Sequence, residues 1–424
     1  MRKSAVFLLV ACCLFGEVKT MTLREALDLA LAQSPEVMLA RLDQQKLREQ
    51  VTIAKDPFVP KVYAGSGAAK TWGFPASIDG AAPSILNAKT QMSLFDRPQS
   101  YQIATANENL RGAAIEVGRQ QDEVAFRVAS LYLDAEQSSR SLQAAQREVE
   151  SLAHVVEYVQ ARVADGRELP LAARKADLSL RKAKNTVENL TLDLLNAEMS
   201  LAVVLGMKPD DRVRPTTEDR QPLAVPVSEE KSIAEAIENS RELKRLESNM
   251  QAKMLEIRGY KAARLPKITL VAQYELFAKY YYQNFYPTFQ RNSGQLGASF
   301  ELPVLVGRSA RAYVNQAEED VAKLRVEGDR TRSRITADLR RAFQEVKRAE
   351  SARDFAREDL DVARDQVSVD LAQNDEGRLP ISAVEQSRAI EQEKWLVYYE
   401  AQHVVERAKL NVMKQTGSLL AGLK

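Results

Sequence analysis

Val59-Pro60-Lys61-Val62 and Leu265-Pro266-Lys267-Ile268 are two nearly equivalent stretches that lie 206 positions apart. Each follows a charged, helix-like stretch and precedes a segment in which apolar and polar residues alternate. Because proline disfavours helical backbone at the residue before it, each stretch predicts a joint between a helix and a β-strand. The two joints are marked by Pro60, Lys61, Pro266 and Lys267, and the chain is expected to contain two copies of one unit.

The sequence on the helical side of the joints repeats at the same offset. Thr22 and Glu25 have the spacing of a capping box, and Ser232 is expected to begin the matching helix of the second copy. Gln33-Ser34-Pro35-Glu36 also aligns with Asn239-Ser240-Arg241-Glu242, again 206 positions on. A shared offset over such a stretch indicates an internal repeat.

The composition argues against a nucleic-acid partner. The chain has 424 residues, of which 28% are charged, yet its net charge is only +2. A nearly balanced, high charge density is typical of solvated helix faces, whereas nucleic-acid binding requires a basic surface.

Residues 1–20 differ from the rest of the chain and are typical of an export signal, with Arg2 and Lys3 before a short apolar core. Both cysteines lie in this segment, so no disulfide framework is expected. Leu9-Val10-Ala11-Cys12 matches the lipobox of bacterial lipoproteins, which would make Cys12 a lipidation site. The alternative is a signal that is cleaved a few residues later. No later stretch is apolar for the 18 to 20 residues, roughly, that a membrane helix needs, so entry into a membrane would require strands.

The segments after the joints alternate as two-faced strands do. In residues 268–278 the even-numbered positions are apolar and most odd-numbered ones are polar, and residues 295–302 alternate in the same way. These segments approach the length of about 9 to 11 residues with which a tilted strand crosses a bilayer. Residues 61–72 and 87–95 form a weaker version in the first repeat.

Aromatic residues gather where each strand hairpin is expected to turn. Trp72 and Phe74 lie at the first turn, and the second carries Tyr280, Tyr281, Tyr282, Phe285, Tyr286 and Phe289. Such residues favour the boundary between lipid tails and headgroups. A soluble sheet with one face on a core is the alternative, and the export signal favours the membrane. Lys61 and Lys267 are then expected near the inner lipid headgroups.

Each strand hairpin is followed by a long helical hairpin with coiled-coil spacing. The second is expected to bury Leu339, Val346, Leu360 and Val367 beside an alanine stripe, with Ala383, Ile390, Val397 and Val404 on its return helix. The tips match as Asp165-Gly166-Arg167-Glu168-Leu169-Pro170 and Asp375-Glu376-Gly377-Arg378-Leu379-Pro380. Glycine allows the turn, and proline begins the return helix.

Four membrane-length strands in one chain cannot close a barrel, because the smallest transmembrane barrels have about eight strands and open edges are not tolerated in lipid. The strands must therefore combine with those of other copies. The predicted fold is mainly α with a β-barrel part: long antiparallel coiled-coil hairpins plus four transmembrane strands per chain.

The doubled order of these motifs, with Val204-Leu205-Gly206 closing the first repeat, resembles the TolC-like family of outer membrane efflux proteins. The resemblance covers about residues 21–418. It implies repeat 1 over 21–205, with strands in about 61–95 and a helical hairpin in about 98–205. A linker or equatorial segment at 206–231 follows. Repeat 2 spans 232–418, with strands in about 267–302, a helical hairpin in about 308–416 and a tail at 419–424.

Membership in that family implies a homotrimer in the outer membrane that extends into the periplasm. It completes an α/β barrel of twelve strands and twelve helices and docks to a periplasmic adaptor and an inner-membrane transporter, proton-driven or of the ABC type. The protein would be a passive conduit without a cofactor or metal, in contact with outer membrane lipids. A channel for type I protein secretion has the same fold and remains an alternative.

The family's entrance is often ringed by acids six and nine residues beyond the second tip glycine, where this chain has Ala383 and Gln386. The acids near the tips are instead Asp165, Glu168, Asp375 and Glu376, beside Gly166 and Gly377. We expect these turns to form the periplasmic entrance, with Asp375 and Glu376 favouring cations. Ordinary solvated turn residues are the alternative interpretation.

Two rival classes fit the sequence poorly. An enzyme is not expected, because only His154 and His403 are available, both expected to be exposed, and no phosphate loop or nucleophile motif is present. A periplasmic coiled-coil adaptor has one long helical hairpin, whereas this chain has two, each preceded by a strand hairpin.

Overall fold

The computed structural model describes residues 18–66, 84–208, 210–216, 223, 228–277, 292–304 and 307–423. Cys12, the core of the predicted signal and the aromatic residues at both strand turns lie outside the described residues. The chain divides into two compact units. The first comprises Met1–Leu39, Gly118–Ser240 and Arg332–Lys424, and the second comprises Ala40–Val117 and Arg241–Thr331.

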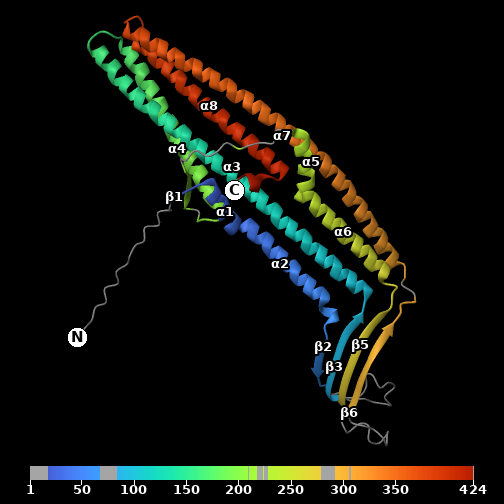
Figure 1. The fold of residues 1–424 in the computed structure, drawn as a ribbon. Helices are drawn as coiled ribbons and strands as arrows, with labels where there is room; N and C mark the ends of the chain where they lie inside the picture. Colours follow the sequence, from blue (N-terminus) through green and yellow to red (C-terminus); the bar gives the residue numbers. More distant parts are fainter. Residues whose placement is uncertain are drawn as a thin grey trace, which may run out of the picture. The chain divides into compact units, whose positions relative to one another are not determined.

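Helices dominate both units (Figure 1). The first unit contains β1 (Val18–Met21), α1 (Leu23–Gln33), α4 (Pro170–Val204), β4 (Arg212–Pro215), α5 (Glu229–Asn239), α8 (Ile381–Thr416) and α9 (Leu419–Gly422). The second contains η1 (Asp56–Phe58), β2 (Lys61–Gly65), β3 (Ser84–Phe95), α6 (Arg241–Ala262), β5 (Lys267–Phe277) and β6 (Asn292–Glu301). Three helices contribute residues to both units, namely α2 (Pro35–Lys55), α3 (Arg97–Ala164) and α7 (Ser309–Asp375).

The core of the first unit joins helices from both repeats. Leu27 of α1, Val124 of α3, Leu201 of α4 and Leu410 of α8 are almost completely buried in one apolar cluster. Each contributes roughly 1.5 to 3 kcal/mol of apolar burial, so the repeats are held together mainly by the hydrophobic effect.

A short parallel sheet of β1 and β4 lies in the first unit, with Val18 opposite Arg212 and Met21 opposite Pro215. The carbonyl of Met21 accepts hydrogen bonds from the Thr216 amide at 3.1 Å and from the Tyr132 hydroxyl at 3.1 Å. The predicted signal, at residues 1–20, therefore ends inside a paired strand. The predicted linker at 206–231 contains β4, whose Val213 is fully buried.

The helix starts agree with the sequence in one repeat and not in the other. The predicted capping box is confirmed, since the Thr22 amide donates to Glu25 at 2.9 Å and the Glu25 amide donates to the Thr22 hydroxyl at 3.3 Å. The expectation that Ser232 begins α5 is wrong, because Ser228 is the N-cap and Ser232 is buried inside the helix. Two acids, Glu229 and Glu230, follow Ser228 in the first turn, where they interact favourably with the helix dipole.

The predicted seam of α7 is confirmed. Leu339, Val346, Leu360 and Val367 are at most 8% exposed, and so are the alanines of the predicted stripe, Ala342, Ala349, Ala356 and Ala363. The expected seam of α8 is not buried in this chain. Ile390, Val397 and Val404 are 44%, 48% and 44% exposed. The heptad spacing is present, but the described residues of this chain do not cover that face.

Two glycines end equivalent helices in the two repeats. Gly206 has φ +76° and Gly417 has φ +72°, a left-handed conformation that glycine adopts without strain. A Cβ on Gly206 would lie 3.0 Å from the carbonyl of Gln33, and one on Gly417 would lie 3.4 Å from Asn239. Gln33 and Asn239 are themselves equivalent positions, so the repeat extends to tertiary contacts.

The second unit contains a four-stranded antiparallel sheet in the order β2-β3-β5-β6 (Figure 1). The two repeats meet in its middle, where β3 pairs with β5, and the outer strands are β2 and β6. In the sequence, α2 precedes β2, α3 follows β3, α6 precedes β5 and α7 follows β6. Each repeat therefore has two strands between two helices.

Candidate functional site

The strand register divides the sheet into an apolar and a polar face. Directly opposed residues point to the same side, so the row Val62, Thr90, Ala272 and Leu296 lies on one face. Its apolar neighbours are Ala64, Leu86, Ala88, Met92, Phe95, Ile268, Leu270, Tyr274, Leu276, Ala298 and Phe300. The alternation predicted for residues 268–278 and 295–302 is therefore confirmed within the described strands, over residues 268–276 and 295–301.

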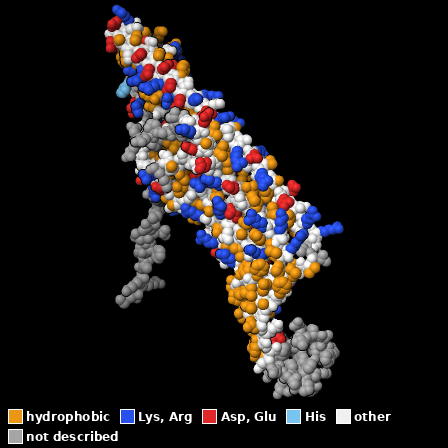
Figure 2. Space-filling model, turned by 45° about the vertical axis from the view of Figure 1, so that its right-hand side comes forward, with side chains coloured by type: hydrophobic (Ala, Val, Ile, Leu, Met, Phe, Trp, Pro, Cys, Tyr) orange, Lys and Arg blue, Asp and Glu red, His pale blue; other side chains and the backbone are white. Residues whose placement is uncertain are grey.

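Much of the apolar face is uncovered. Leu296 is 78% exposed, Val62 74% and Phe300 64%. Figure 2 shows hydrophobic side chains gathered over the sheet, with basic side chains more frequent on the neighbouring helical surface. The strands β3, β5 and β6 have 12, 11 and 10 residues, which is enough to cross a bilayer when tilted. An exposed apolar band of that height matches the surface that a transmembrane sheet presents to lipid.

The opposite face is polar. It carries Lys61, Tyr63, Asn87, Lys89, Gln91, Ser93, Lys267, Thr269, Gln273, Glu275, Ser293, Gln295, Ser299 and Glu301, with Val271 and Phe277 of β5 as apolar exceptions. Gln273 donates to the Glu275 carboxylate at 2.5 Å, so polar groups on this face are partly paired along a strand. Such a face is suited to line an aqueous passage.

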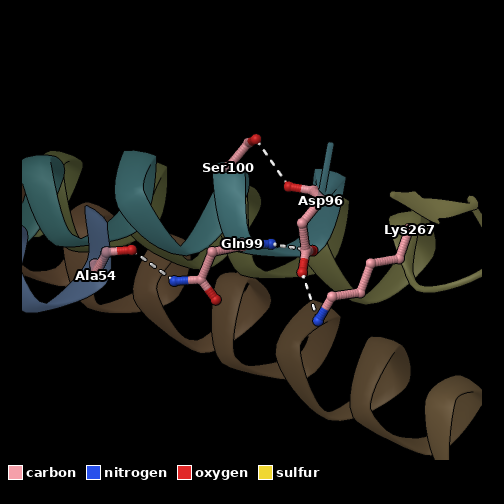
Figure 3. Close-up of polar contacts among 5 residues, drawn as sticks. All are labelled: Ala54, Asp96, Gln99, Ser100 and Lys267. Atoms are coloured by element: carbon pink, nitrogen blue, oxygen red, sulfur yellow. Dashed lines mark hydrogen bonds and ion pairs between the residues drawn. The ribbon is translucent and has the colours of Figure 1, made fainter. Parts of the chain in front are cut away.

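The second joint is organised by Asp96, the residue before α3 (Figure 3). One carboxylate oxygen of Asp96 accepts a hydrogen bond from the Gln99 amide at 3.0 Å, as an N-cap does. The other lies 3.2 Å from the Lys267 ammonium at the start of β5. The side-chain amide of Gln99 donates to the Ala54 carbonyl at 2.7 Å near the end of α2. One small cluster thus connects a strand of the second repeat to two helices of the first.

The first joint has a similar ion pair, between Lys61 and Asp56. Pro60 directly precedes β2, and Pro266 directly precedes β5. Both joint lysines lie on the polar face of the sheet, because they alternate with the apolar Val62 and Ile268. The register directs each of these side chains toward an aspartate, and their expected place near the inner lipid headgroups stays a prediction.

The helix tips form the same turn twice. Gly166 has φ +71° and Gly377 has φ +74°. The amide of Arg167 donates to the Arg162 carbonyl, and the amide of Arg378 donates to the Gln373 carbonyl, both at 2.9 Å. This is the Schellman pattern, in which glycine in the left-handed conformation closes a helix end.

The tip acids differ in their surroundings. Asp165 and Asp375 are exposed, whereas Glu376 lies 3.1 Å from Arg378. Glu168 is only 22% exposed at its side chain and lies 3.9 Å from Arg162. The arginines reduce the net negative charge of both tips. Gln386 on α8 is exposed and Ala383 is half-buried, so α8 has no acid at the two positions that the family often uses.

The histidines do not form a metal site. His154 is exposed as expected, but the expectation for His403 is wrong, because its side chain is 11% exposed and lies 3.0 Å from Asp134. Arg407 contacts the same carboxylate at 3.2 Å. Among the described residues no cluster of ligating side chains suited to a metal is found. Within the same residues, no helix has a long enough apolar stretch to cross a membrane.

The sequence interpretation missed three acidic groups that the structure places at helix contacts. These are Asp96, the buried Asp370 of α7, and Glu385 of α8, which is 8% exposed. Asp96 had a local signal, since aspartate two residues before Pro98 is typical of a helix start. Asp370 and Glu385 had none, because the helix packing that surrounds them brings together residues far apart in the chain.

Comparison with protein families gives a match over most of the chain. The family described as outer membrane efflux protein matches residues 26–207 and 232–418. The chain belongs to the outer membrane efflux protein family. The first matched segment corresponds to the first repeat and the second to the second repeat. The unmatched segment between them contains β4. No curated protein sequence gives a significant match.

Solved structures of outer membrane efflux proteins have the same fold. The chain resembles CusC, described with channel formation in the membrane, with a TM-score of 0.77 and 13% identity over 93% of this chain and 92% of that one. It resembles the Campylobacter jejuni outer membrane channel CmeC with a TM-score of 0.75 and 14% identity over 93% and 85% of the chains. For the Vibrio cholerae outer membrane protein VceC the values are 0.74 and 13% over 93% and 96%.

Family membership places the protein in the bacterial outer membrane and identifies it as an efflux channel rather than an enzyme. The two-faced sheet of the second unit is the part of the fold suited to lipid. The rival interpretation as a periplasmic adaptor is excluded by the same match, which includes both helical hairpins and both strand hairpins.

Proposed function

We propose that the protein is the outer membrane channel of a tripartite efflux system. It is a passive trimeric conduit for substrates delivered by an inner-membrane transporter through a periplasmic adaptor. The observation that carries this proposal is the sheet, which has one apolar face, one polar face and two edges that no described strand pairs with. A structure with these three properties is stable in a membrane only when further strands close it.

The exposed edges of the sheet support closure by further strands. Every residue of β2 from Lys61 to Gly65 is exposed, and so is every residue of β6. Because each copy supplies four strands to this sheet, closure needs several copies. Three copies give a barrel of about twelve strands, within the range known for membrane barrels. The polar faces then surround a water-filled lumen, and the apolar faces contact outer membrane lipids.

The helices also carry unpartnered apolar stripes at heptad spacing. On α7, Phe355, Val362 and Val369 are 70%, 67% and 49% exposed. A second stripe on α4 consists of Leu171, Leu178 and Leu192, all more than half exposed. Exposed large apolar side chains on a regular stripe favour helix packing against another chain. They support tight association of the helical hairpins between copies.

The matching tip turns are the proposed periplasmic entrance. The exposed carboxylate of Asp375, together with Glu376, would favour cations when repeated around an oligomer axis. Replacing both by Asn and Gln is expected to reduce cation preference of single channels in planar bilayers. Unchanged conductance and ion preference would refute this role for the two acids and leave the conduit itself intact.

The oligomer is tested first. The protein, extracted from outer membranes in mild detergent, is expected to have the mass of a trimer by light scattering. Phe355→Ser combined with Val362→Ser should shorten the lifetime of that trimer by at least tenfold, roughly, because each lost apolar contact is worth about 1 to 2 kcal/mol. Glu358→Ser, at a polar exposed position of the same helix, is the control. A monomer in detergent would contradict the proposal.

The partners are tested in cells. A photo-crosslinking residue at Arg167 or Arg378, next to the tip glycines, is expected to capture a periplasmic adaptor, and through it an inner-membrane transporter. A photo-crosslinker at exposed Lys244 of α6 is the matched control. Recovery of a secretion apparatus carrying a polypeptide would instead support the protein-secretion alternative.

A further inference from the structure

A cavity of about 630 Å³ lies near the helix tips, between the two helical hairpins of the first unit. It is lined by α3, by the turn that follows it, and by α4 and α8. Its volume is in the range of sites that hold drug-sized molecules. All of its lining residues belong to the first unit, whereas the four-stranded sheet belongs to the second.

The wall supplied by α3 is apolar. Leu152, Val155 and Val159 line it and are 7%, 7% and 3% exposed. Ala176 of α4 and Ala389 of α8 add small side chains on the other sides. Such a lining favours an apolar ligand body and offers few oxygen ligands, so it does not suit a bare metal ion.

One buried carboxyl group interrupts this lining. Glu385 of α8 is 8% exposed and lines the cavity. Its Oε1 accepts a hydrogen bond from Arg388 at 3.3 Å, whereas its buried Oε2 has no hydrogen-bond partner. Burial raises the pKa of Glu385, and Arg388 only partly opposes that effect. A buried carboxylate with a free oxygen is costly, and a cation beside it would lower that cost.

We propose that this cavity binds a small organic cation with an apolar body, with the Glu385 carboxylate as its counter-ion. The apolar wall of α3 receives the body of the ligand, and Oε2 of Glu385 receives the charge. The ligand would contact both hairpins and hold them together near their tips. This inference does not rest on the transport role, since it concerns binding to the isolated channel.

The other charged groups around the cavity are compatible with such a ligand. Arg388, on the same helix as Glu385, engages Oε1 and leaves Oε2 available. Lys175 of α4 is exposed, so its ammonium group can remain in water. Glu168, in the turn after α3, is a second acid at the rim. Among the residues of α3, α4 and α8 that line the cavity, Glu385 is the only acid.

The test measures binding of tetraphenylphosphonium to the full-length protein in detergent, by calorimetry, with neutral triphenylphosphine oxide as the matched probe. The native protein should bind the cation saturably and at least tenfold more tightly than the oxide. Glu385→Gln should weaken cation binding about tenfold and leave oxide binding unchanged, because it removes only the charge. Glu393→Gln, an exposed acid on the same helix, should bind as the native protein does.

Two further measurements control for misfolding of the variants and for uptake of the probes by detergent micelles. Ala176→Phe, which fills the cavity, should abolish binding of both probes, whereas binding to detergent micelles would persist. Acidification should weaken cation binding to the native protein as Glu385 becomes protonated, and it should have little effect on Glu385→Gln. Equal cation affinity for native protein, Glu385→Gln and Ala176→Phe, or no saturable binding to the native protein, would overturn the proposal.

Discussion

The two helical hairpins have the same plan but differently built seams. Within the described part of the chain, no side-chain hydrogen bond or ion pair joins α3 to α4, and their contact is apolar. Between α7 and α8 the Ser387 hydroxyl donates to the buried Asp370 carboxylate. Lys394 lies 2.6 Å from Asp359, and Lys409 lies 3.5 Å from Glu350.

Arg364 adds a further contact to the second hairpin. Its guanidinium lies 4.0 Å from Glu391 and 5.8 Å from the ring centre of Trp395, both on α8. An apolar seam is stabilised by contact at many relative positions of its two helices, whereas polar pairs across a seam form at one register only. We infer that α7 and α8 are held at one register, and that α3 and α4 tolerate small shifts along their seam.

The largest expected effect comes from exchanging the two kinds of seam. Leu194→Asp in α4 would bury a carboxylate without a partner at a position that is 8% exposed. We expect it to cost about 3 kcal/mol or more. Asp370→Leu in α7 should change stability by no more than about 1 kcal/mol, because apolar replacement of buried charges is often tolerated. Thermal unfolding in detergent, followed by circular dichroism, gives both values.

Equal destabilisation by these two substitutions would show that the seams do not differ as described. Leu192→Asp, at an exposed position of α4, is the control for the new charge alone and should be almost neutral.

A smaller effect is expected from removing one polar contact of the second hairpin. Ser387→Ala leaves Asp370 with only the Gln366 amide, which donates at 2.7 Å. Loss of a hydrogen bond to a charged group costs about 1.5 to 3 kcal/mol. Ser200→Ala on α4, at an exposed serine, is the matched control and should be neutral within about 0.5 kcal/mol. The same unfolding measurement applies, and no difference between the two variants would argue against the polar register.

Ionisation of Glu385 should change the stability of the protein by a smaller amount, and the sign of this change is defined. Burial raises the pKa of this group above its ordinary value, so the folded protein binds its proton more tightly than the unfolded chain does. The group therefore costs stability as pH rises through the unfolded and then the folded pKa. Glu385→Gln should raise the Tm slightly at neutral pH, and the gain should vanish at acidic pH. A gain that persists at acidic pH would mean that the charge is not the cause.

The smallest expected effect is that of salt. The Lys394–Asp359, Arg364–Glu391 and Lys409–Glu350 pairs are partly exposed, so solvent screening keeps the contribution of each to stability small. Raising the ionic strength should increase amide hydrogen exchange in α7 and α8 more than in α3 and α4. Equal responses of the two hairpins would show that these ion pairs do not stabilise the second one.

Local signals in the sequence were sufficient to predict helices and strands and to predict which of their faces are apolar. The Thr22 cap, the strand alternation and the α7 seam all follow from residues close together in the chain. Ser232 was misplaced because Ser228, four residues earlier, has the same capping chemistry and is followed by two acids. The α8 stripe at Ile390, Val397 and Val404 has the right spacing but remains exposed, because periodicity does not say which chain covers a face.

The sequence by itself determined the two repeats, the apolar and polar faces of the strands and the glycine turns at the tips. These depend on short-range periodicity and on backbone conformations that few residues adopt. Only the tertiary structure decided which polar groups meet: Lys267 with Asp96, Asp134 with His403, and Glu385 with a cavity between hairpins. Such contacts join residues far apart in the chain, so their distances follow from how the helices pack rather than from any local pattern.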